Sequence, residues 1–179
     1  MTSFGKIVSG STLLLLLSPV SFIGCSRQNS AKDADTTFAE QAAAGGMAEV
    51  RLGQLAQERG NSVAVKDFGS QMVADHTEAG SKLQVVARQA NVSLPSDMTA
   101  EDRALYSKLS GLSGTAFDQA YASAMVNDHE TDVADFEKEA SQGKVNQIRQ
   151  FAADTLPTLR THLEKARQLQ KTVLAAANL

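Results

Sequence analysis

Four long stretches of this sequence repeat their apolar residues at the spacing of an α-helix. This pattern limits the fold more than any other feature of the chain. The stretches cover residues 37–59, 63–90, 114–141 and 145–174. No segment alternates apolar and polar residues with the period of two that is typical of a half-buried strand. The sequence therefore predicts an all-α fold.

The breaks between these stretches predict how the helices are connected. Gly60 is suited to cap the end of the first helix, and Gly143 ends the third. The link at residues 91–113 is longer and contains a predicted short helix at 100–109, which Thr99 and Asp102 cap together. Short, long and short links describe an antiparallel four-helix bundle over residues 37–175, with its longer connection between the second and third helices.

Pro157 falls inside the fourth predicted helix. Proline has no backbone N–H and therefore cannot make the hydrogen bond that a helix interior requires. We expect Pro157 either to kink this helix or to begin a new helical segment.

Residues 1–24 differ from the rest of the chain. They contain one charge, Lys6, followed by an apolar segment over residues 11–23, as in a secretory signal peptide. The segment ends Phe22-Ile23-Gly24-Cys25, which resembles the bacterial lipobox and predicts lipidation of Cys25. The alternative is plain secretion with Cys25, the only cysteine, as an incidental thiol. Residues 25–36 are polar, which predicts a flexible tether between the anchor and the helical domain.

The lipobox implies a protein exported to the cell envelope and held at a membrane by its lipid. In a host with two membranes, Ser26 in place of Asp favours the outer membrane, facing the periplasm. Lys6 is the only charge before Cys25, so 16 of the 17 Lys and Arg remain against 20 Asp and Glu. This mild acidity argues against nucleic acid as a partner. The sequence names no protein partner.

Each predicted helix places one potential metal ligand on its apolar face. His76, His129 and His162, the three histidines of the chain, lie on the second, third and fourth helices. The first helix has no histidine but carries Glu49, three residues before Leu52. Counted from the predicted helix ends at about 1.5 Å per residue, the four side chains agree in depth to within about one and a half turns.

Three imidazoles and a carboxylate that converge in a helical core form a suitable site for one divalent transition metal: Zn, Fe, Mn or Cu. Asp75 and Asp128 directly precede two of the histidines, and we expect them to orient neighbouring imidazoles. Met72 and Met125 are interpreted as core residues rather than copper ligands. The alternative is a polar, hydrogen-bonded core layer that holds no metal and no other cofactor.

Several stretches resemble the bacterial "domain of unknown function 4142" family over roughly residues 36–170: Gly45–Gly53, Val65–Gly69, Met72–His76, Phe117–Tyr121, Met125–His129 and Leu156–Leu163. The resemblance implies an exported, ferritin-like helical protein, often named an outer membrane protein. Di-iron proteins of that fold carry Glu-x-x-His motifs. Here Val73, Val126 and Leu159 stand three residues before the histidines, so ferroxidase and iron-storage activities are not carried over.

Two functions follow from these patterns. The first is an envelope metal-binding protein that uses Glu49, His76, His129 and His162. The second is a non-catalytic envelope interaction protein in which the histidine layer is structural. The sequence contains no nucleophile elbow, no phosphate-binding glycine loop and no His-Glu-x-x-His motif, so a hydrolase is the weakest option.

Overall fold

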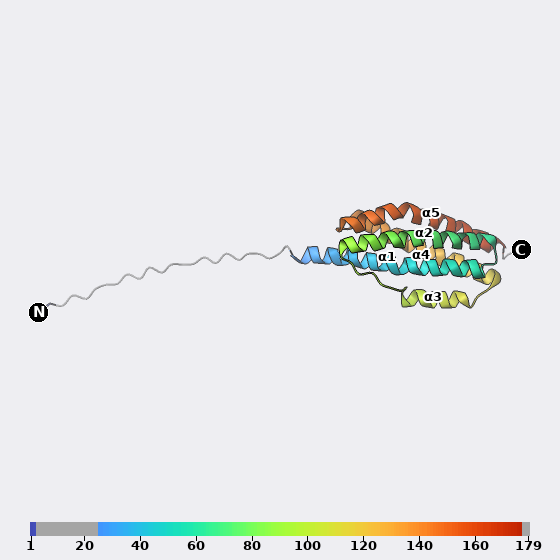
Figure 1. Ribbon diagram of the computed structural model, residues 1–179, viewed down its shortest axis with the longest axis horizontal. Coiled ribbons are helices and arrows are strands. Elements are labelled where there is room, and N and C mark those ends of the chain that lie inside the picture. Colours follow the sequence, from blue (N-terminus) through green and yellow to red (C-terminus); the bar gives the residue numbers. More distant parts are fainter. Residues whose placement is uncertain (3–24, 177–179) are drawn as a thin grey trace.

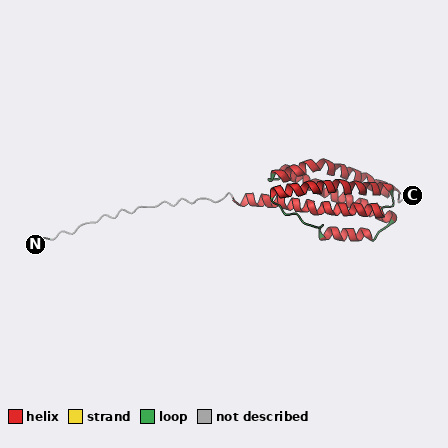
Figure 2. Ribbon diagram, in the orientation of Figure 1, coloured by secondary structure: helices red, strands yellow, loops and turns green. Residues whose placement is uncertain are grey.

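The computed structural model describes residues 1–2 and 25–176, with side chains described for residues 1–2 and 34–176. Its regular elements are five helices, joined by three short loops and a longer one before α3 (Figures 1 and 2): α1 Cys25–Arg59, α2 Val63–Ala90, α3 Ala100–Ser110, α4 Gly114–Gln142 and α5 Asn146–Ala176. The prediction of an all-α fold is confirmed, and no strand occurs in the described residues. The predicted signal peptide at residues 1–24 lies outside the described residues except for Met1 and Thr2.

The fold contains one helix more than the four of the predicted bundle. The additional helix, α3, lies in the longer connection, where the sequence predicts a short helix. Thr99 and Asp102 form the predicted capping box at its start. Figure 1 shows α3 on the outside, while α1, α2, α4 and α5 run side by side.

The α1–α2 and α4–α5 loops are each held by a carboxylate from the other pair of helices. Asp118, near the start of α4, accepts the backbone N–H groups of Asn61 and Ser62 at 2.8 Å each. Asp35, on α1, accepts the backbone N–H groups that precede α5, with a distance of 2.7 Å to the nitrogen of Lys144. Each carboxylate satisfies donors at a helix start that would otherwise lack partners.

The burial of Asp35 shows that the helical domain begins before residue 37, where the sequence analysis placed its start. Helix α1 begins at Cys25, so it includes the residues assigned above to a tether, and Asp35 is only 2% exposed. The polarity of residues 25–36 indicated a solvated segment. The partners of Asp35, however, are backbone groups more than a hundred residues further along the chain.

Helix α5 continues through Pro157, so the alternative of a new segment at this position is wrong. Proline removes the hydrogen bond to the carbonyl of Ala153. Ala153 lies on the exposed side of the helix, where water can take the place of the missing donor.

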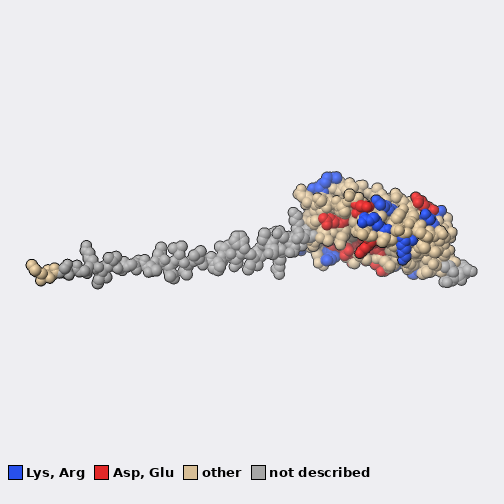
Figure 3. Space-filling view, turned by 90° about the horizontal axis from the view of Figure 1, so that it is seen from below, with Lys and Arg blue, Asp and Glu red and all other residues tan. Residues whose placement is uncertain are grey.

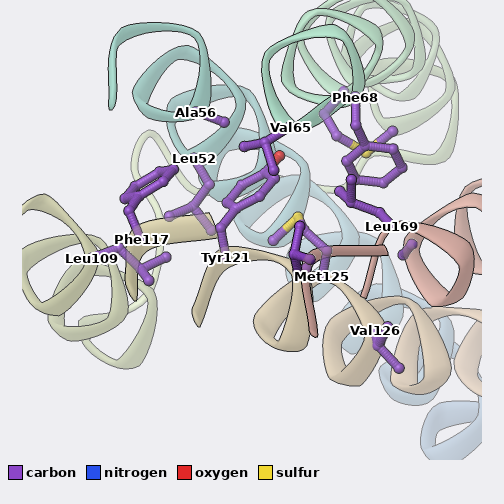
Figure 4. Close-up of a cluster of buried hydrophobic side chains, with 14 of the residues drawn as sticks. Leu52, Ala56, Val65, Phe68, Leu109, Phe117, Tyr121, Met125, Val126 and Leu169 are labelled. Carbon is purple, nitrogen blue, oxygen red and sulfur yellow. The ribbon is translucent and has the colours of Figure 1, made fainter. Parts of the chain in front are cut away.

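The interior consists of two apolar clusters with a polar layer between them. One cluster lies near the α1–α2 loop and is partly drawn in Figure 4, where Phe117 and Tyr121 of α4 face Leu52 and Ala56 of α1. The other cluster contains Phe38, Leu83, Phe136, Ile148 and Phe151. On each of the four long helices, the predicted metal-ligating residue falls between the residues of the two clusters.

The surface mixes charges of both signs. In the view of Figure 3, basic and acidic side chains are interspersed over the helices. Among the described residues, none of the helices combines the length and the apolarity that a membrane crossing requires.

Candidate metal centre

The four side chains predicted as ligands meet in the polar layer. The ring centroids of His76, His129 and His162 lie 5.3–5.8 Å from one another. Glu49 reaches the same point from α1. The exposed fractions of these residues are 6% for His76 and 1% or less for the other three. The convergence predicted from helix spacing is therefore observed among buried side chains.

Glu49 lies against two of the imidazoles without making hydrogen bonds to them. Its Oε2 is 2.7 Å from His76 Nδ1, and its Oε1 is 3.3 Å from His129 Nε2. Neither oxygen accepts a hydrogen bond from an imidazole. Distances of about 3 Å are also expected between two donor atoms that bind the same metal ion, each about 2.1 Å from it.

His129 is fixed in one tautomer. Its Nδ1 lies 2.9 Å from the backbone carbonyl of Met125. A carbonyl can only accept, so Nδ1 carries the proton and the lone pair is on Nε2. This lone pair faces Glu49 Oε1, another acceptor, and Nε2 has no hydrogen-bond partner. A buried contact between two acceptors requires a positive charge between them, either a proton or a metal ion.

His162 is oriented in the same way by a carboxylate. Its Nε2 donates to Asp75 Oδ2 at 2.7 Å, which leaves the lone pair on Nδ1, a buried atom with no partner. Although partial burial favours the neutral acid, hydrogen bonds from His162 and Gln71 lower the pKa of Asp75 and keep it ionised. This is the orienting role that the sequence predicts for Asp75.

His76 completes the group of imidazoles. Its Nδ1 faces Glu49, and its Nε2 is buried without a hydrogen-bond partner. His76, His129 and His162 each offer a ligand atom, and these three atoms lie within 4.8 Å of one another. Three buried and unpartnered nitrogens, two of them with a defined lone pair, form a group that could hold a transition-metal ion.

Asp128 lies beside the carboxylate of Glu49. Glu49, Asp128 and His129 form a second group whose ligand atoms lie within 4.8 Å of one another. The hydrogen bonds of the described residues include none between Asp128 and an imidazole, so the structure places it against Glu49 and not in the orienting position predicted for it.

The electrostatics of the layer favour a bound cation. Burial, together with the neighbouring carboxylate of Asp128, raises the pKa of Glu49 well above its usual range. Burial also raises the pKa of Asp128. None of the ion pairs formed by Lys or Arg among the described residues involves these carboxylates. A divalent ion would supply the positive charge that the protein does not provide.

The imidazoles are in the form that binds metal. Burial, together with the neighbouring His76 and His162, lowers the pKa of His129 to about 3. Burial lowers the pKa of His76 as well. It also lowers the pKa of His162, against the opposing hydrogen bond to Asp75. Neutral imidazoles are the ligating species, so no proton has to leave these rings at neutral pH before an ion binds.

Asp132 belongs to this site although the sequence analysis does not include it. It lies on α4 and lines the same pocket as Glu49 and His76. Burial and the carboxylates of Glu49 and Asp128 raise its pKa well above the usual range. Its position three residues after His129 and four after Asp128 is the sequence signal that would have indicated it, because such residues share one face of a helix.

The comparisons with known proteins identify a family but no characterised relative. The family described as "Domain of unknown function (DUF4142)" matches residues 24–169, so the chain belongs to this family. No curated protein and no solved structure matches the chain significantly.

Proposed function

For this member of a family without an assigned activity, we propose that the protein binds one divalent transition metal through Glu49, His76, His129 and His162. In this proposal α1, α2, α4 and α5 form a ferritin-like four-helix bundle, and α3 is an additional helix outside it. The ion is Zn, Fe, Mn or Cu. We further propose that the protein acts in the cell envelope, anchored through lipid on Cys25, at the outer membrane in a host with two membranes.

One contact carries the metal proposal. The lone pair of His129 Nε2 faces Glu49 Oε1 at 3.3 Å inside the protein, and neither atom has a hydrogen-bond partner. A polar layer built only for stability would pair such groups, since an unpaired buried polar atom costs about 1–3 kcal/mol. A metal ion bound by both atoms and by the neighbouring imidazoles satisfies the whole group at once.

Metal titration of the mature protein, made without a histidine tag, tests this proposal. We expect one equivalent of at least one of the four metals to bind. Glu49→Gln should weaken binding strongly, because it removes a charged ligand. Asp75→Asn, which changes only the group that orients His162, should weaken it by about 10–100-fold. The matched control is Glu139→Gln, which alters another buried carboxylate with an unpartnered oxygen.

Equal affinity in the wild type, Glu49→Gln and Glu139→Gln would overturn the proposed ligand set. If the wild type bound none of the four metals, the structural alternative would replace the proposal. The protein would then be an envelope interaction protein with a polar core layer.

The membrane anchor has its own test. In a bacterium that produces the full chain, radioactive palmitate should label the wild type, which should fractionate with the outer membrane. Cys25→Ser should abolish the labelling and release the protein. Ser26→Ala, at the neighbouring position, should remain labelled. Labelling of Cys25→Ser equal to that of the wild type would overturn the anchor.

A further inference from the structure

A pocket of about 460 Å³ leads from the surface to the proposed metal centre. Its lining comes from α1, α2, α4, α5 and the loop that follows α2. The inner end includes Glu49, His76 and Asp132, whereas His129 and His162 do not line it. A metal held by the four ligands would therefore be approached from the side of Glu49 and His76.

The walls of this pocket are mainly apolar. Leu83, Phe136, Phe151 and Leu159 line it together with small residues of α1. Pockets for small molecules in proteins have volumes of about 300–1,000 Å³, predominantly apolar walls and a few polar groups that fix the orientation of the ligand. This pocket has all three properties, and the polar groups of Glu49, His76 and Asp132 lie on the side of the proposed metal centre.

Three helical glycines keep the pocket open. Gly45 and Gly46 on α1 and Gly80 on α2 all line it. A Cβ atom built on any of the three would have no neighbour within 4 Å, so close packing does not explain them. Glycine in a helix interior costs about 0.5–1 kcal/mol relative to alanine. Close packing does not require these glycines. Their effect on the structure is therefore the open space that they leave in the pocket.

We propose that this pocket binds a small organic molecule with an apolar body and one oxygen- or nitrogen-donor head group that completes the coordination of the metal. The inference rests on the proposed function, since the head group binds the ion. With four protein ligands, the head group would be a fifth ligand, as in metal sites whose coordination expands from four to five. The apolar walls bury the body of the ligand.

The groups at the inner end make this binding dependent on metal. There the carboxyl groups of Glu49 and Asp132 do not favour an electron-rich head group. A divalent ion reverses this preference by giving the head group a bond and the site a positive charge. The metal-free protein should therefore not bind the same ligand.

The test uses the mature, Co²⁺-loaded protein and benzohydroxamate, a probe with an aromatic body and two oxygen donors. We expect benzohydroxamate to change the visible absorption of the bound Co²⁺ in a saturable way. The variants Gly46→Leu and Gly80→Leu each fill the pocket from a different helix. Each should weaken probe binding at least about tenfold while leaving the Co²⁺ content and spectrum unchanged. Gly111→Leu is the matched control, because Gly111 is exposed and lies at the end of α3.

The outcomes separate this inference from the proposed function. If Co²⁺ binds but benzohydroxamate does not change its spectrum, the pocket ligand is overturned and the metal site stands. Equal probe affinity in the wild type and both glycine variants would overturn the role of the pocket. If neither Co²⁺ nor any of the four metals binds, both proposals fail together.

Discussion

The α1–α2 pair and the α4–α5 pair are similar in length and are capped alike, yet they are built from different residues. Asp118 caps the loop of the first pair and Asp35 caps that of the second. The first pair contains five glycines within its helices, whereas the second contains only one, Gly114 at the start of α4.

The glycines of the first pair serve two opposite purposes. At Gly53 and Gly69 the helices nearly touch, because a Cβ on either would lie within 2.7 Å of the other's backbone oxygen. At Gly45, Gly46 and Gly80 the same absence of a side chain leaves open space. The first pair is therefore closed at one end and open at the other, and the opening leads to the polar layer.

The closed end gives the largest expected effect. Gly53→Ala places a Cβ 2.6 Å from the backbone oxygen of Gly69, which cannot move aside without separating the helices. We expect the free energy of unfolding to fall by about 3 kcal/mol, as for an overpacked core. Urea denaturation measures this loss. A stability equal to that of the wild type would show that α1 and α2 are not in close contact here.

The proposed metal centre joins the two helix pairs, since Glu49 and His76 belong to the first and His129 and His162 to the second. Zn²⁺ at 100 times its dissociation constant should raise the free energy of unfolding by about 2.7 kcal/mol. Removal of the ion by a chelator should reverse the gain. Urea denaturation of Glu49→Gln at the same Zn²⁺ concentration should show a much smaller gain. An equal gain in this variant would place the bound ion elsewhere.

Glu139 distinguishes the second pair by its response to pH. Burial, together with the neighbouring Asp35, raises the pKa of Glu139 to about 7, above the value of 4.5 for the free side chain. Between these two values the folded protein retains a proton that the unfolded chain has released, so this group makes stability fall as pH rises from about 4.5 to about 7.

Glu139→Gln does not titrate and should escape this loss. After solvent screening is taken into account, we expect it to be more stable than the wild type by about 1 kcal/mol at pH 8. At pH 4 the two proteins should be nearly equal. Urea denaturation at both pH values gives the two free energies of unfolding. A difference between the proteins that did not change with pH would argue against a raised pKa of Glu139.

The open end gives the smallest effect, and its sign is opposite to that of the closed end. Gly46→Ala adds a methyl group where nothing lies within 4 Å, in the interior of a helix. We expect it to stabilise the protein by about 0.5–1 kcal/mol. Thermal unfolding, measured beside Gly53→Ala, should show the two variants shifted in opposite directions. Destabilisation by Gly46→Ala would mean that the space at Gly46 is filled.

Helix positions and buried faces were predictable because they depend on local spacing. The bounds of α2 agree with the prediction, and the capping box at Thr99 was predicted from a four-residue pattern. The convergence of Glu49 with the three histidines also followed, since all four lie on apolar faces at similar depth.

The hydrogen-bond partners that side chains find on other helices were not predictable from spacing. Asp35 was assigned to a tether because its neighbours in sequence are polar, but its partners lie at the start of α5. Asp128 was expected to orient an imidazole, but it lies near Glu49 and His129 without a hydrogen bond to a histidine. Asp132 was not identified, although its spacing from Asp128 and His129 placed it on their face of the helix; that it lines the pocket depends on how α4 faces the first helix pair.

By itself, the sequence determined that the chain forms helices and which residues each helix turns inward, because a period of 3.6 residues is a local property. The tertiary structure decided which nitrogen of His129 and of His162 carries its lone pair into the layer. It also decided which glycines close the first helix pair and which open it. These properties depend on distances of a few ångströms between helices, which no spacing along one helix specifies.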